Sequence, residues 1–146
     1  TQANGIASNI EIKPDPGLEA LTGRRVAELA HALWEGAGPA PLLSSFSVDA
    51  LRAAMEAAPE LPRGLLIDQS LAAGHLDQAR RLECVSIHLK DGGTRKEHVR
   101  AALDANLRVV VWTVNHVQRA RQLIHWGCSA IVTDNILDMP AALPDS

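Results

Sequence analysis

The feature that most constrains the fold is a regular alternation of short apolar runs with longer helical segments. The six runs are Asn9–Lys13, Pro41–Phe46, Gly64–Asp68, Cys84–His88, Arg108–Val114 and Ala130–Thr133. Runs of this length and composition are typical of strands that are buried on both faces of a parallel sheet. The spacing, one strand about every 20–30 residues, predicts an α/β fold.

The segments between the runs carry helix signals. Val26, Leu29 and Leu33 form an apolar stripe at the spacing of an amphipathic helix. Ser47 is a natural N-cap for the next helix, because its hydroxyl can accept a bond from a free backbone N–H. Residues Thr94–Glu97 have the pattern of a capping box at the start of a later helix.

Six predicted strands are compatible with two architectures. An open doubly wound sheet normally carries a glycine-rich phosphate turn, and the sequence contains neither G-x-G-x-x-G nor a P-loop. The other architecture is a (β/α)8 TIM barrel, of which the chain would supply about the last six β/α units. We predict the barrel, as a single domain over residues 1–146. Two absent strands would leave an unpaired edge, so the chain is expected to need N-terminal strands or an oligomer partner.

Composition and charge exclude several classes of protein. The net charge of −3, the scattered basic residues and the 3% aromatic content disfavour nucleic-acid binding. No apolar run approaches the roughly 18–20 residues of a membrane span, and no signal peptide is visible, so we expect a cytoplasmic protein. Cys84 and Cys128 lie in apolar stretches and are expected to be buried free thiols.

The strand Asn9–Lys13 is the most informative stretch for chemistry. With a period of two, Asn9, Glu11 and Lys13 share one face of the strand, and the two isoleucines share the other. An inward carboxylate and ammonium need partners. One interpretation is a Glu11–Lys13 ion pair. The other is a site in which Glu11 binds Mg²⁺ or Ca²⁺ and Lys13 binds a phosphate.

Other polar and aromatic residues stand at strand ends. Trp112 and Phe46 each close an apolar run, where they either fill the core or wall a ligand pocket. Asp134 follows the last run and is interpreted first as a helix cap. Among six histidines only His88 is well placed for a site, and no pair has metal-ligand spacing.

These motifs, taken in order, resemble those of the glycerophosphodiester phosphodiesterases, and in particular the bacterial cytosolic branch of that family. The resemblance is carried by Asn-Ile-Glu-Ile-Lys-Pro at 9–14, Leu-Leu-Ser-Ser-Phe at 42–46, Leu-Pro-Arg-Gly-Leu-Leu at 61–66, Cys-Val-Ser-Ile-His-Leu at 84–89, Trp-Thr-Val-Asn at 112–115, Trp-Gly at 126–127 and Ile-Val-Thr-Asp at 131–134. It covers nearly the whole chain and identifies it as the C-terminal portion of such a barrel.

The resemblance implies metal-dependent hydrolysis of glycerophosphodiesters to glycerol 3-phosphate and an alcohol. It implies that Glu11 is a metal ligand, that Lys13 contacts the substrate phosphate, and that Phe46 and Trp112 line the substrate mouth. The His-Arg-Gly motif, the Glu-x-Asp ligands and the second catalytic histidine of the family have no counterpart here, because the chain starts at about the third strand. We therefore expect no catalytic histidine in the chain, and no activity of the chain alone.

Two other functions remain open at this point. The first is a non-catalytic partial barrel that serves binding or assembly. The second is an unrelated phosphate-binding barrel enzyme such as an isomerase, for which the series of family motifs would be a coincidence.

Overall fold

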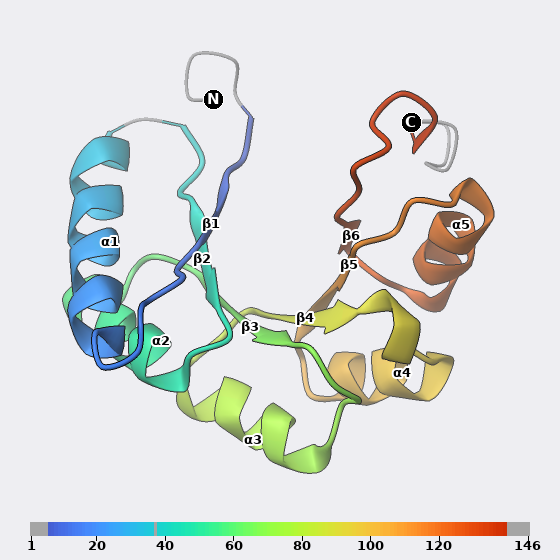
Figure 1. Ribbon diagram of the computed structural model, residues 1–146, viewed down its shortest axis with the longest axis horizontal. Coiled ribbons are helices and arrows are strands. Elements are labelled where there is room, and N and C mark those ends of the chain that lie inside the picture. Colours follow the sequence, from blue (N-terminus) through green and yellow to red (C-terminus); the bar gives the residue numbers. More distant parts are fainter. Residues whose placement is uncertain (1–5, 37, 140–146) are drawn as a thin grey trace. The chain divides into compact units, whose positions relative to one another are not determined.

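The computed structural model describes residues 6–36 and 38–139. Its strands are β1 (Asn9–Glu11), β2 (Leu42–Ser45), β3 (Arg63–Ile67), β4 (Ser86–Lys90), β5 (Arg108–Trp112) and β6 (Ala130–Ile131). Its helices are α1 (Glu19–Trp34), α2 (Val48–Ala57), α3 (Ala73–Arg81), α4 (Lys96–Asp104) and α5 (Val117–Trp126), with a short 3-10 turn η2 (Asp91–Gly93). The predicted alternation of strands and helices is confirmed (Figure 1).

The chain divides into two compact units. The first comprises residues 1–66 and 77–85, and the second comprises residues 67–76 and 86–146. Each unit is described by itself below. The single domain over residues 1–146 stays a prediction.

In the first unit, β1, β2 and β3 pair in parallel. Asn9, Ile10 and Glu11 are register partners of Leu42, Leu43 and Ser44, and Ser44 in turn pairs with Gly64. Helices α1 and α2 lie on one side of β1 and β2 (Figure 1). The core between these layers consists of Ile12, Ala27, Ala30, Leu43, Ala50, Ala54, Ala58 and Leu61, with Ile10 packed against it. The isoleucines of the first strand therefore face the helices, as the period of two predicted.

Helices α1 and α2 approach each other very closely at Gly23. A Cβ atom at this position would lie 2.2 Å from the backbone oxygen of Ala50, at the start of α2. Only a residue without a side chain fits there, and the neighbouring contacts are made by Ala27 and Ala30, both fully buried. The buried face of α1 is therefore a row of small residues.

This close packing places most of the apolar stripe of α1 elsewhere than on the buried face. Leu29 and Leu33 are 62% and 63% exposed, and Leu18 and Leu21 are also exposed. Of the predicted stripe, Val26 is partly buried and packs against the core of the unit, whereas Leu29 and Leu33 are exposed.

The predicted N-cap of α2 is confirmed. The Ser47 Oγ accepts a hydrogen bond of 3.1 Å from the Ala50 N–H, which would otherwise lack an intrahelical partner. The same serine N–H donates to the Ser45 Oγ over 3.0 Å, so the turn from β2 into α2 is fixed by two hydroxyl groups.

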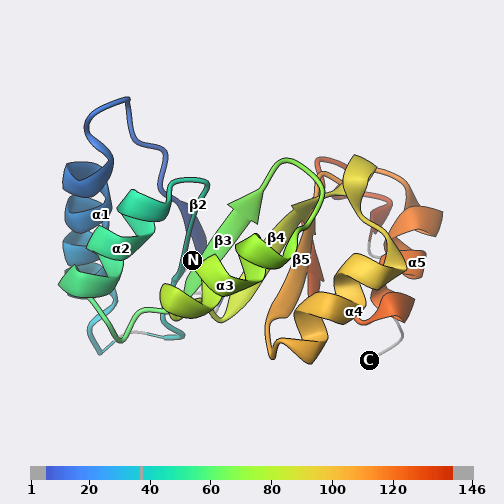
Figure 2. The same ribbon diagram turned by 90° about the horizontal axis from the view of Figure 1, so that it is seen from below.

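In the second unit, β4, β5 and β6 also pair in parallel, with Lys90 opposite Trp112 and Val111 opposite Ile131. Figure 2 shows α4 and α5 next to one another beside β5. Arg119 of α5 joins these elements. Its guanidinium donates to the Asp91 carboxylate at 2.7 Å and to the Thr94 carbonyl at 2.8 Å, and it stacks on the Trp126 ring.

The predicted capping box at Thr94–Glu97 is wrong. The Thr94 hydroxyl donates to the Lys90 carbonyl at 2.8 Å and so closes the turn after β4 instead of capping α4. The cap residue is Arg95, whose backbone N–H donates to the His98 Nδ1 at 3.3 Å. Helix α4 therefore starts one residue later than the sequence pattern indicated.

Both cysteines are free thiols and buried, as predicted. Within residues 6–36 and 38–139, none of the helices has the length and apolar character required to traverse a lipid bilayer.

Candidate active site

The carboxyl ends of β1 and β2 bring three of the predicted site residues to one region of the first unit. Glu11 is the last residue of β1 and Lys13 follows two residues later on the same face, while Phe46 directly follows β2. All three side chains are exposed. Their exposure contrasts with Ile12, which is 1% exposed and packs under the helices.

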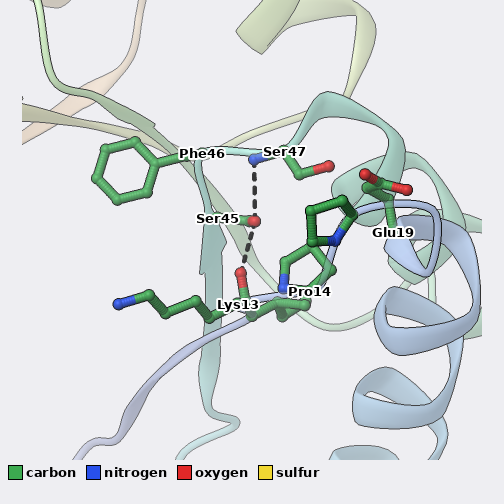
Figure 3. Close-up of a pocket in the computed structure, with 8 residues that line it drawn as sticks. Lys13, Pro14, Glu19, Ser45, Phe46 and Ser47 are labelled. Carbon is green, nitrogen blue, oxygen red and sulfur yellow. Dashed lines mark hydrogen bonds between the residues drawn. The ribbon is translucent and has the colours of Figure 1, made fainter.

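An open groove of about 310 Å³ lies beside these strand ends. It is lined by Ile12, Lys13, Pro14, Pro16, Glu19, Ser45, Phe46 and Ser47. Figure 3 shows the side chains of Lys13 and Phe46 extending to the same side of the two strands, away from Glu19. A cation and an aromatic ring on one side provide the charge and the apolar wall that a phosphate ester with an organic group requires.

The wall of the groove is held by local hydrogen bonds. The Ser45 Oγ donates to the Ile12 carbonyl at 2.7 Å and thereby ties the end of β1 to the end of β2. Glu19 has a structural partner, because its carboxylate accepts a bond of 3.1 Å from the Gly17 N–H. Glu11 does not line the groove; it lies one pleat below Lys13 on the same face.

The described residues contain no Glu11–Lys13 ion pair, so that interpretation of the strand is not supported. A carboxylate at a strand end suits Mg²⁺ or Ca²⁺, which bind hard oxygen ligands. Among the described residues, however, no group of three or more His, Cys, Asp or Glu side chains gathers to hold a metal ion. Glu11 therefore fits as one ligand of a divalent cation and not as a complete site.

Trp112 lies in the second unit, at the carboxyl end of β5. It is partly exposed, and its register partner is Lys90, the last residue of β4. Lateral partners in a parallel sheet share a face, so Lys90 and Trp112 present a cation and an indole together. Lys90 was not among the residues that the sequence singled out, and it is exposed at the end of β4.

Asp134 lies in the loop after β6 and bonds to the loop after β5. Its carboxylate accepts a bond of 3.2 Å from the Asn115 side-chain amide, and its backbone N–H donates to the Asn115 Oδ1 at 2.9 Å. These bonds join the loop after β5 to the loop after β6. Among residues 6–36 and 38–139 the Asp134 carboxylate bonds to Asn115 and caps no helix, so its interpretation as a helix cap is not supported.

Comparisons with known proteins show the family of the chain. A family model described as the glycerophosphoryl diester phosphodiesterase family matches residues 1–138. The chain belongs to this family. Comparison with curated proteins gave no match.

Solved structures of the family have the same fold. A phosphodiesterase from Oleispira antarctica, in complex with the product sn-glycerol-3-phosphate, has a TM-score of 0.82 and 25% identity over 96% of this chain and 56% of its own. Glycerophosphodiester phosphodiesterases from Thermotoga maritima (TM-score 0.66, 20% identity, 88% of this chain and 54% of that one) and Agrobacterium tumefaciens (0.65, 20%, 94% and 55%) are also similar. The predicted α/β barrel class is confirmed, and the chain spans little more than half the length of these relatives.

Arg63, in the family motif Leu-Pro-Arg-Gly, has a structural role. It is 2% exposed and lies at the amino end of β3, whereas the candidate site residues lie at the carboxyl ends of β1 and β2. Its guanidinium donates to the carbonyls of Leu82 at 3.1 Å, Pro59 at 3.1 Å and Leu61 at 2.7 Å. It also lies 3.6 Å from the Glu83 carboxylate. The arginine therefore binds the carbonyls of two loops and is not directed toward a substrate.

His88, the only histidine that the sequence placed near a site, is buried. It is 1% exposed, and its Nε2 lies 2.9 Å from the Ser86 Oγ within the same strand. Burial lowers the pKa of the His88 imidazole to about 4, because desolvation disfavours the charged ring. A neutral, enclosed imidazole cannot reach a substrate and serves the packing of the second unit.

The buried imidazole predicts a pH-dependent stability. Its folded-state pKa is depressed, and the unfolded chain has a pKa of about 6.5, so the unfolded state binds more protons between these values. The contribution of neutral His88 to the free energy of unfolding is therefore complete above pH 6.5. It is lost as the pH falls toward 4, by about 3 kcal/mol in total. Urea unfolding at pH 7.5, 6, 5 and 4.5 measures this slope. His88→Gln should flatten it, whereas the exposed His116→Gln control should keep it; an unchanged slope in His88→Gln would contradict the assignment.

Proposed function

We propose that the protein carrying this chain hydrolyses glycerophosphodiesters to glycerol 3-phosphate and an alcohol, with Mg²⁺ or Ca²⁺ as cofactor. The observation that carries the proposal is the placement of Glu11, Lys13 and Phe46 at the carboxyl ends of two neighbouring strands, where barrel enzymes keep their sites. Membership of the family supports the reaction class. The glycerol 3-phosphate bound to the Oleispira antarctica relative supports the nature of the product.

Each residue has a distinct part in this proposal. Glu11 contributes one carboxylate oxygen to the divalent cation, which when bound neutralises charge at the phosphorus centre. The Lys13 ammonium donates to a phosphate oxygen and fixes the position of the ester. Phe46 provides an apolar wall for the organic part of the substrate in the first unit. A substrate-binding role of Trp112, at the end of β5 in the second unit, is proposed from the family resemblance alone. The groups that transfer protons are supplied by parts of the barrel that these residues do not include, so the chain alone is expected to be inactive.

Two surfaces of the first unit support the need for further strands or an oligomer partner. Among the described strands of this unit, β1 pairs only with β2, so one of its edges has no backbone partner. Helix α1 and its N-cap residue expose a row of leucines that is unusual for a solvent-facing helix: Leu18, Leu21, Leu29 and Leu33. A cytoplasmic location belongs to the same proposal and follows from the resemblance to the cytosolic branch of the family.

The proposal is tested by glycerol 3-phosphate release from a glycerophosphodiester by the natural protein that carries this chain. Activity should be lost on chelation and restored by Mg²⁺ or Ca²⁺. Lys13→Met should lower kcat/KM by roughly 10–100-fold, because a charge-assisted bond to phosphate is worth about 1.5–3 kcal/mol.

Lys96→Met is the matched control for this measurement. Lys96 is an exposed lysine in a separate groove beside Glu97 and Asp104, and its loss should leave kcat/KM unchanged. Equal activity of the Lys13 and Lys96 variants would refute the phosphate role, and absence of any release would favour a non-catalytic binding module.

A further inference from the structure

Ser44 is a buried hydroxyl without a hydrogen-bond partner. It is 0% exposed, and among the described residues its Oγ meets no donor or acceptor. Its neighbour Ser45 is also buried but uses its hydroxyl fully, donating to the Ile12 carbonyl and accepting from the Ser47 N–H. An unsatisfied buried hydroxyl is unfavourable, and alanine at this position would avoid that penalty. The free Ser44 hydroxyl therefore points to a partner that is not in place in this arrangement of the described residues.

The register identifies the residue that Ser44 can serve. Its lateral partners are Glu11 on β1 and Gly64 on β3. Lateral partners in a sheet share a face, with backbones about 4.8 Å apart. Gly64 has no side chain, so Glu11 is the polar side chain in the same row of this unit. The residues two positions before and after Ser44, Leu42 and Phe46, are apolar, while Asn9 of β1 and Lys13 just beyond β1 lie one row away from Glu11.

We propose that Ser44 is a positioning residue whose Oγ–H donates to the Glu11 carboxylate and orients it as a ligand for a divalent cation. This inference rests on the proposed function. The carboxylate of Glu11 is exposed and is not bonded to Ser44, so the proposed hydrogen bond requires the Glu11 side chain to rotate toward its lateral neighbour. A ligating carboxylate held by a second hydrogen bond keeps one oxygen directed at the cation, and such outer partners typically change metal affinity by about 10–100-fold.

The test measures cation binding directly, without turnover. The natural protein that carries this chain is titrated calorimetrically with Mg²⁺ and, separately, with Ca²⁺. Ser44→Ala should raise the Kd by about 10–100-fold. Ser44→Thr keeps a hydroxyl, so its Kd should stay within a few-fold of that of the unmodified protein. Ser44→Val has the shape of threonine without the hydroxyl, so it should raise the Kd as alanine does.

Thermal unfolding separates this role from a merely structural one. Without cation, Ser44→Ala should have a melting temperature equal to or above that of the unmodified protein, because it removes an unsatisfied group. A Kd of Ser44→Ala equal to that of the unmodified protein, or equal Kd values for the threonine and valine variants, would overturn the inference. Glu11→Gln in the same titration distinguishes the two proposals. If its Kd equals that of the unmodified protein, the cation role of Glu11 is refuted. If its Kd is higher while the Ser44 variants keep the Kd of the unmodified protein, only the role of Ser44 is refuted.

Discussion

Replacement of Glu11 by glutamine in the natural protein is expected to lower kcat/KM for glycerol 3-phosphate release by about a thousand-fold. The amide has the shape of the carboxylate but carries no charge, so the cation would be held more weakly and less charge would be neutralised in the transition state. Such a loss corresponds to about 4 kcal/mol of transition-state stabilisation. A continuous assay at saturating Mg²⁺ or Ca²⁺ measures it.

Glu56→Gln is the matched control. Glu56 is an exposed glutamate on α2 in the same unit, remote in sequence from the strand ends that carry the candidate site. Its variant should retain full activity. If Glu11→Gln were as active as Glu56→Gln, the carboxylate would have no part in the reaction, and the chemical role assigned to the end of β1 would be wrong.

Substitution of Gly23 should have the largest effect on folding. A Cβ atom there would meet three backbone atoms of Ala50, at 2.2, 2.8 and 2.8 Å, and backbone cannot rotate away as a side chain can. We expect Gly23→Ala to lower the free energy of unfolding by about 2–3 kcal/mol, even though alanine favours helix. Gly23→Val should be worse still.

Urea unfolding followed by circular dichroism measures this loss as a shift of the midpoint. Gly74→Ala is the control, because Gly74 also lies in a helix but a Cβ atom added there would meet no other atom within 4 Å. It should leave stability unchanged or raise it by up to about 1 kcal/mol. Similar midpoints for the two alanine variants would show that α1 and α2 can move apart without loss.

Periodicity alone was enough to locate the strands, because each is a short apolar run between helical segments; β3 is buried along its whole length, whereas β1 exposes Asn9 and Glu11. The first and last residues of the strands were predicted less accurately than their existence. The run Cys84–His88 was predicted as a strand, but the strand is Ser86–Lys90. Glu83 adopts a φ of 51°, and the Cys84 N–H donates to the Ala79 carbonyl, so this segment closes the turn after α3. An apolar sequence does not distinguish a buried turn from a buried strand.

The side of a helix that is buried was harder to predict. The leucines of α1 gave the clearest pattern, yet Gly23, Ala27 and Ala30 make the contact with α2. Glycine and alanine contribute little to the hydropathy pattern from which a buried helix face is predicted. They stabilise the packing because they allow two helix backbones to approach closely. Only the three-dimensional arrangement shows that distance.

The candidate site was predicted as far as single strands allow. Glu11 and Lys13 belong to one predicted strand, Asn9–Lys13, so a period of two placed them together, although β1 ends at Glu11. Phe46 was placed by its position at the end of the next run. The register of β1 with β2 was not readable from the sequence, so Ser44 went unnoticed. Arg63 was recognised only as part of a motif, because nothing in its neighbours shows that three carbonyls surround it.

Each compact unit contains one buried thiol, Cys84 in the first and Cys128 in the second. Desolvation raises the pKa of both to about 11, so almost no reactive thiolate forms while the units are closed. Alkylation of either cysteine then requires its own unit to open. The rates at which Cys84 and Cys128 are labelled, measured by peptide mass spectrometry on the unmodified chain, would therefore report the opening of the first and the second unit separately.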